Sequence, residues 1–172
     1  MRSLTRDWHG SGENPLTDAE VDEHTAAYQQ HREAVLPQLP DDLKTLAGQP
    51  IDGHHRNLHD GRVEAWEAEL PDRIVLQIVC GDVRHRYERL QIEYRGAELI
   101  GASEHNLAAW LGNERTELLY QEVDAIPDGR FEHRHLLWPQ GEFGIRFTDI
   151  SVTATTVTPD DYDRAKRPAS NL

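Results

Sequence analysis

The spacing of apolar residues along the chain changes near residue 58. Before that point Val21, Tyr28 and Val35 form a stripe at helical spacing, between charged and amide side chains. After it, apolar and aromatic residues recur at every second position, in short runs separated by turn residues. The first part of the chain therefore predicts helix, and the larger second part predicts strands.

The first helix has a clear start signal. Thr17 and Glu20 form a capping box, in which the threonine hydroxyl accepts a free backbone N–H and the glutamate reaches back to the cap residue. We expect a helix from residue 17 to about 35, ended by Pro37 and Pro40. Residues 41–47 can add one or two further turns.

The alternating part predicts six or seven short antiparallel strands. Pro127, Asp128 and Gly129 give the strongest hairpin signal, and Ser103 can cap a short helix that ends at Leu111. The predicted strands cover residues 62–70, 73–80, 85–94, 114–126, 131–138, 143–148 and 151–157. Three runs are predicted to share one face within their strands: Ile74/Leu76/Ile78/Cys80, Leu90/Ile92/Tyr94 and Phe143/Ile145/Phe147.

These elements predict a single α+β domain, in which an N-terminal helix packs on a mainly antiparallel sheet that curls toward a barrel or a sandwich. Residues 1–16 form an N-terminal arm, and residues 17–158 form the domain, with a helical part at about 17–47 and a β-rich part at about 58–158. Residues 159–172 contain little that can be buried, so we expect a flexible tail there.

Charge and composition restrict the choice of partners. The 172 residues carry a formal net charge of −13, which repels nucleic-acid backbones and anionic membrane surfaces. Because no apolar run is long enough for a signal peptide or a membrane span, we expect a cytoplasmic protein. The single cysteine, Cys80, lies in an apolar run and is interpreted as a buried, inert thiol.

A set of short motifs gives the chain a family resemblance. These are Arg6-Asp7-Trp8, the capped acidic helix, Leu58-His59-Asp60-Gly61 at the entry to the strands, and Phe147-Thr148-Asp149-Ile150. In their order the chain resembles uncharacterised bacterial proteins with a domain of unknown function. The Leu-His-Asp entry into a β-meander also resembles immunity proteins of polymorphic toxin systems. The resemblance implies a fold, and it transfers no catalytic residue.

Two histidines on one predicted strand suggest a metal site. His133 and His135 alternate with Arg134, so both imidazoles lie on one face, about 7 Å apart. A divalent transition metal would need further ligands from His59 and Asp60, or from residues 54–55. In the alternative interpretation the two histidines lie on the exposed face, or bond to each other and to nearby carboxylates, and no metal binds.

His59 and Asp60 can also be interpreted as a general-base pair. Neighbouring residues in a strand point to opposite faces, so we expect no direct contact between these two side chains. The favoured interpretation is structural, with Asp60 and Gly61 in a turn and His59 bonded to backbone. Ser103 is expected to act as a helix cap and lacks the glycine context of a hydrolase nucleophile.

Three functions remain open, and we lean against an enzyme. The leading hypothesis is a non-catalytic acidic interaction module, such as an immunity-type toxin inhibitor, with a basic protein partner and no cofactor. Its contact residues would be Trp138, at an exposed hairpin tip, and Asp22 and Glu23 on the first helix. The alternative is a small metal- or ligand-binding β-domain, or an enzyme, that uses the histidine cluster. The third is a homodimer, formed through an open sheet edge or through the Val21/Tyr28/Val35 stripe.

Overall fold

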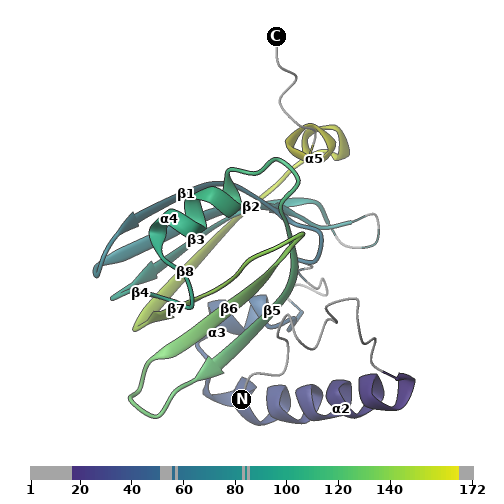
Figure 1. The fold of residues 1–172 in the computed structure, drawn as a ribbon, viewed down its shortest axis with the longest axis vertical. Helices are drawn as coiled ribbons and strands as arrows, with labels where there is room; N and C mark the ends of the chain where they lie inside the picture. Colours follow the sequence, from purple (N-terminus) through teal and green to yellow (C-terminus); the bar gives the residue numbers. More distant parts are fainter. Residues whose placement is uncertain (1–16, 51–55, 57, 83, 85, 167–172) are drawn as a thin grey trace.

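The computed structural model describes residues 17–50, 56, 58–82, 84 and 86–166. This part of the chain has an α+β fold with four α-helices and two antiparallel sheets (Figure 1). The helices are α2 (Asp18–Val35), α3 (Asp41–Leu46), α4 (Glu104–Leu111) and α5 (Pro159–Lys166), and a 3-10 turn, η1 (Leu36–Gln38), follows α2. None of the described helices is long and apolar enough to cross a bilayer.

Each sheet contains four strands. The first sheet has the order β1-β2-β3-β8 and the second the order β4-β7-β6-β5, and Figure 1 shows them as two layers. The strands are β1 (Arg62–Glu69), β2 (Arg73–Cys80), β3 (Glu88–Arg95), β4 (Glu98–Ile100), β5 (Glu117–Ala125), β6 (Phe131–Trp138), β7 (Glu142–Phe147) and β8 (Asp149–Thr156). The sandwich alternative of the prediction therefore fits this arrangement, and no closed barrel forms.

One hydrophobic cluster fills the space between the sheets. Strands β2 and β3 pair so that Leu76 lies opposite Ile92 and Ile78 lies opposite Leu90, and all four side chains are completely buried. The three predicted apolar faces are confirmed, because every one of their residues is at most 1% exposed. Burial of each such side chain contributes about 1.5–3 kcal/mol to folding.

Helix α2 begins as its capping box predicts. The Thr17 hydroxyl accepts the backbone N–H of Glu20, and the Glu20 carboxylate accepts the backbone N–H of Thr17. The helix contacts the edge strand β5. The hydroxyl of Tyr28, in α2, donates to the backbone carbonyl of Gln121, in β5, over 3.4 Å. Val35 belongs to the common core. Two residues of the predicted stripe therefore pack within this chain.

Helix α3 connects the two sheets. Its Leu43 and Leu46 are buried in the common core. The Asp42 carboxylate accepts the backbone N–H of Val152 in β8, and the backbone carbonyl of Leu46 accepts the side-chain amide of Gln121 in β5. Because β8 and β5 are edge strands of different sheets, α3 covers the edge between them.

The prediction of six or seven strands was wrong, because the described part of the chain has eight. The seven predicted strands coincide within three residues with seven of the observed ones, but β4 is an eighth, and the strands form two sheets rather than one. Strand β4 has only three residues, between Gly96 and Gly101, which both have positive φ. A run this short carries no recognisable alternation, since strands usually have five or six residues.

The predicted flexible tail was wrong over residues 159–166, where α5 forms and contacts β1 and β2. The hydroxyl of Thr158 accepts the backbone N–H of Asp161 and donates to its carboxylate, and Tyr162 packs on Tyr87 with ring centroids 4.7 Å apart. Thr158 followed by Pro159 is a helix-start signal that the sequence analysis missed. Residues 167–172 lie outside the described part.

Candidate functional site

His133 and His135 lie inside the molecule, between the two sheets. They are 0% and 1% exposed, and their ring centroids are 4.0 Å apart. The interpretation that places them on the exposed face of the strand is therefore wrong. Their neighbour Arg134 lies on the opposite, outer face of β6, where it forms an ion pair with Glu132.

A chain of hydrogen bonds runs from the core to helix α3. The hydroxyl of Tyr94, on β3, lies 2.9 Å from Nδ1 of His133, and Nε2 of His133 lies 2.8 Å from Oε1 of Gln121. The Gln121 amide nitrogen then donates to the backbone carbonyl of Leu46 over 2.7 Å. This chain, which we call the Tyr94–Leu46 relay, joins both sheets and α3 through polar side chains.

The direction of each bond in the relay follows from its last member. The carbonyl of Leu46 can only accept, so Gln121 must direct its NH2 group to Leu46 and its carbonyl oxygen to His133. His133 must therefore carry its proton on Nε2, which leaves Nδ1 as the acceptor for the hydroxyl of Tyr94. The relay is fully satisfied only when His133 is a neutral imidazole.

The electrostatics of the interior agree with this assignment. Burial holds the pKa of His133 well below its ordinary value, and repulsion from His135 adds to this effect. Burial alone lowers the pKa of His135 to about 3. His135 stacks on Phe143 with ring centroids 4.7 Å apart, and its two nitrogens have no hydrogen-bond partner in the described part of the chain. Both histidines are neutral at physiological pH.

A β-bulge turns Gln121 toward the interior. The pairing of β5 with β6 shifts between Leu118 and Tyr120, so one extra residue is inserted in β5. Beyond the bulge, Gln121 and Val123 follow Leu118 on the inner face, while Tyr120 is half-buried on the other side. Strict alternation would have grouped Leu118 with Tyr120, so Gln121 was missed as a site residue.

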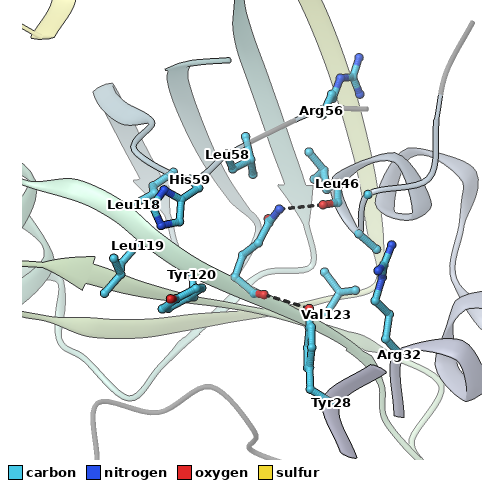
Figure 2. A pocket seen from close by; sticks show the side chains of 13 residues that line it. Tyr28, Arg32, Leu46, Arg56, Leu58, His59, Leu118, Leu119, Tyr120 and Val123 are labelled. Atoms are coloured by element: carbon cyan, nitrogen blue, oxygen red, sulfur yellow. Dashed lines mark hydrogen bonds between the residues drawn. The ribbon is translucent and has the colours of Figure 1, made fainter. Parts of the chain in front are cut away.

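A pocket of about 410 Å³ lies between α2, α3, the start of β5 and the residues Arg56, Leu58 and His59. We call it the α2–β5 pocket. Figure 2 shows Tyr28 and Arg32 on one side of it and His59 and Tyr120 on the other. The apolar part of the lining consists of Leu46, Ala47, Leu58, Leu118, Leu119 and Val123, and the polar side chains are Tyr28, Arg32, Arg56, His59, Tyr120 and Gln121. The relay thus ends at the wall of this pocket.

The two arginines of the pocket differ in their partners. Arg56 forms an ion pair with Glu88 at 3.4 Å, and its Nη1 donates to the Thr45 hydroxyl over 2.7 Å. Arg32 donates to the side-chain carbonyl of Gln29 over 3.3 Å, and its buried Nε has no hydrogen-bond partner. No described carboxylate forms an ion pair with Arg32.

The expectation that His59 and Asp60 do not touch was wrong. Nδ1 of His59 lies 3.0 Å from a carboxylate oxygen of Asp60. Asp60 has φ +60, so the backbone is in a turn rather than in a strand, and the alternation argument does not apply. The predicted turn at Asp60 and Gly61 is confirmed, since the Gly61 N–H donates to the carbonyl of Leu58. The pair lies at the rim of the pocket, with side chains 44% and 56% exposed.

The proposed metal ligands lie in two different environments. His133 and His135 are in the core, where both nitrogens of His133 already have partners, while His59 and Asp60 are at the surface. Within the described ranges, no group of three or more His, Cys, Asp or Glu side chains is arranged to hold a metal ion. Residues 54–55 lie outside these ranges, and the metal site stays a prediction.

The side chains predicted to bind a partner are exposed, and the single cysteine is buried. Trp138 is 52% exposed where β6 ends, and Asp22 and Glu23 are exposed on α2. Helix α2 packs on β5, whereas Trp138 is the last residue of β6. Cys80 is buried as expected, and burial raises its pKa to about 12.

Comparisons of the chain with models of known protein families, with curated proteins and with solved structures gave no match. The resemblance suggested by the short motifs stays a prediction. The function must therefore be inferred from the geometry of the pocket and its surroundings.

Proposed function

We propose that the protein is a binding domain that holds a small organic molecule in the α2–β5 pocket. The observation that carries this proposal is the pocket itself, which combines a volume of about 410 Å³ with a leucine-rich lining and a few polar side chains. Sites for small molecules in proteins are typically cavities of about 300–1,000 Å³ of this composition. The proposal follows the ligand-binding alternative of the sequence analysis, without a metal.

Two features support binding in a preformed site. The Gln121 side chain at the pocket wall is held at both ends, by His133 and by the backbone of Leu46, so its position is fixed before a ligand arrives. The described lining also contains no Ser, Thr, Cys, Asp or Glu side chain. Such side chains supply most nucleophiles in enzymes, so this lining, in which His59 beside Asp60 is the acid–base group, favours binding over nucleophilic catalysis.

The proposal can be tested with the neutral fluorescent probe N-phenyl-1-naphthylamine. Its emission should rise on binding to the native protein, and the variant Ala47→Phe, which places a ring in the pocket, should weaken binding about tenfold or more. Ala109→Phe, at an exposed position of α4 outside the lining, is the matched control and should bind like the native protein. Circular dichroism would verify that both variants are folded.

Two results would overturn the pocket as a binding site. One is equal binding by the native protein and folded Ala47→Phe, because the probe would then occupy another part of the molecule. The other is no fluorescence change at any probe concentration that the solution permits. Either result would return the protein to the second function considered next.

The second candidate is the acidic interaction module, of immunity type, with a basic protein partner. Its support is Trp138, a large aromatic side chain that is 52% exposed on a protein of net charge −13. Exposed tryptophans are frequent anchors of protein interfaces, and the acidic surface would speed encounter with a basic partner.

Native mass spectrometry of the untagged protein, purified at low salt from its own cells, tests this candidate. A basic partner should be present with the native protein, be absent with Trp138→Ala, and be reduced with the double variant Asp22→Asn/Glu23→Gln. Leu70→Ala removes another exposed apolar side chain, 40% exposed, and should leave the complex intact. Unchanged recovery of the partner with Trp138→Ala would exclude Trp138 as the anchor. The homodimer would be detected in the same spectra as a doubled mass.

A further inference from the structure

Among the described residues, one positive charge in the wall of the α2–β5 pocket has no carboxylate partner. The described lining has two arginines and no carboxylate, and only Arg56 has a carboxylate partner, Glu88. The guanidinium of Arg32 is bonded to the neutral amide of Gln29. The protein as a whole has a net charge of −13, so a lining with two arginines and no described carboxylate differs in charge from the rest of the molecule.

The end of helix α3 leaves room for the Arg32 guanidinium. Gly48 follows α3 with φ +86, and a Cβ atom at this position would lie only 3.0 Å from Nη2 of Arg32 and 3.8 Å from its Cζ. Only glycine adopts this backbone conformation without strain and also accepts the arginine at this distance. Figure 2 shows Arg32 extending from α2 toward the end of α3 that carries Leu46. The guanidinium therefore lies at the pocket wall rather than extending into bulk solvent.

Arg32 is also incompletely solvated. Its Nε is shielded from solvent and has no hydrogen-bond partner among the described residues. A buried donor without an acceptor is unfavourable, and a charged donor more so. A carboxylate or sulfonate in the pocket would supply the missing negative charge beside the Arg32 guanidinium, and hydrogen bonds between such groups and arginine are strong.

The neighbouring groups leave this charge in place. Burial raises the pKa of Tyr28 and outweighs the opposite effect of Arg32, with a smaller raising contribution from the Glu122 carboxylate, so the phenol beside Arg32 stays neutral. Glu122 itself is next to Gln121 in β5 and is not part of the pocket lining. It lies opposite Arg134 in the register of β5 and β6, on the outer face of the second sheet.

We infer that the α2–β5 pocket is selective for organic anions, with the anionic group at Arg32 and an apolar, flat body along Leu46, Leu58 and Leu118. This inference rests on the proposed function, because it names the class of molecule that the same pocket takes. The lining leucines provide the apolar contact, and the volume of about 410 Å³ is sufficient for a ligand with one or two fused rings. Free carboxylates and sulfonates of this size belong to the same class.

A pair of matched probes tests the inference. 8-Anilinonaphthalene-1-sulfonate has the skeleton of N-phenyl-1-naphthylamine with an added sulfonate, so the two probes differ in the anionic group. Native protein should bind the sulfonate more tightly. Arg32→Gln should raise the dissociation constant of the sulfonate about tenfold, the value expected for the loss of one charged hydrogen bond. The same variant should change that of the neutral probe by less than about twofold.

Two control variants distinguish the loss of a local contact with Arg32 from a change in the net charge of the protein. Arg164→Gln removes the same charge from α5, at the opposite end of the molecule in Figure 1, where the side chain is 76% exposed. It should leave the binding of both probes unchanged. Arg32→Lys keeps the charge but changes the hydrogen-bond geometry, so its affinity for the sulfonate should lie between those of the native protein and Arg32→Gln.

The outcomes distinguish the inference from the proposed function. If Arg32→Gln binds both probes as the native protein does, or if Arg164→Gln weakens the sulfonate equally, the anion selectivity is wrong while the pocket remains a binding site. If Ala47→Phe binds both probes like the native protein, the probes bind elsewhere, and the proposed function fails together with the inference.

Discussion

The inner faces of the two sheets differ in polarity, although they enclose the same core. In the first sheet, β2 and β3 contribute Ile74, Leu76, Ile78, Leu90 and Ile92, and Tyr94 is the polar exception. In the second sheet, β5 and β6 direct Gln121, His133 and His135 inward. The polar atoms of Tyr94 and of the second sheet meet in the Tyr94–Leu46 relay, which ends at the α2–β5 pocket.

This difference separates two tasks within one fold. The apolar face of the first sheet stabilises the sandwich by burial, which is non-directional and tolerates changes of neighbour. The polar groups in the second sheet contribute less net free energy, but each bond fixes a direction and a protonation state. We therefore expect substitutions in the first sheet to change stability most, and substitutions in the relay to change the pocket as well.

The largest effect is expected in the first sheet, for Leu76→Ala. Leu76 is completely buried, between Trp66 of β1 and Ile92 of β3, so truncation leaves a cavity in the centre of the sheet. The free energy of unfolding should fall by about 3–4 kcal/mol, as for other buried leucines. Urea denaturation followed by tryptophan fluorescence measures it. A loss below about 1 kcal/mol would mean that the neighbouring side chains refill the space.

The same comparison explains what the sequence could predict. The faces of β2, β3 and β7 were predicted correctly because an apolar residue recurs at every second position of each strand, and the capped helices α2 and α4 were also predicted. These signals are local, and each lies within one element. The faces of these strands and the starts of α2 and α4 could therefore be predicted from the chain alone.

The pocket depends on contacts that are distant in sequence. Gln121 bonds to Leu46, 75 residues away, and Tyr28 bonds to the backbone of Gln121 across 93 residues. The bulge in β5 that turns Gln121 inward has no reliable sequence signal, and histidine alone does not show on which face of a strand it lies. Arg32 is on the predicted helix, but its role depends on Gly48 beyond the next helix.

A smaller loss is expected when the relay is cut, with Gln121→Leu. This nearly isosteric change leaves the Leu46 carbonyl and the Nε2–H of His133 without partners, which should lower the free energy of unfolding by about 2–3 kcal/mol. Gln77→Leu makes the same change in the first sheet, at a half-buried position, and should stay within about 0.5 kcal/mol of the native protein. Equal losses in both variants would contradict a structural role of the relay.

The smallest effect concerns pH and His135. The pKa of His135 in the folded protein, about 3, lies below the value of about 6.5 in the unfolded chain, so between them the unfolded chain binds more protons. The contribution of neutral His135 to stability is therefore fully present above about pH 6.5 and is lost as the pH is lowered toward 3. At pH 5.5 the neutral His135 should cost about 1 kcal/mol of stability relative to pH 8.

The variant His135→Leu removes one of the two buried histidines of β6. Its loss of stability between pH 8 and pH 5.5 should be smaller than that of the native protein by about 1 kcal/mol, measured by urea denaturation at both pH values. His105→Leu, at an exposed position of α4, is the matched control and should keep the native pH dependence. An unchanged pH dependence in His135→Leu would mean that His135 is protonated in the folded protein. Solvent would then reach the polar inner face of the second sheet, whereas the apolar inner face of the first sheet excludes it.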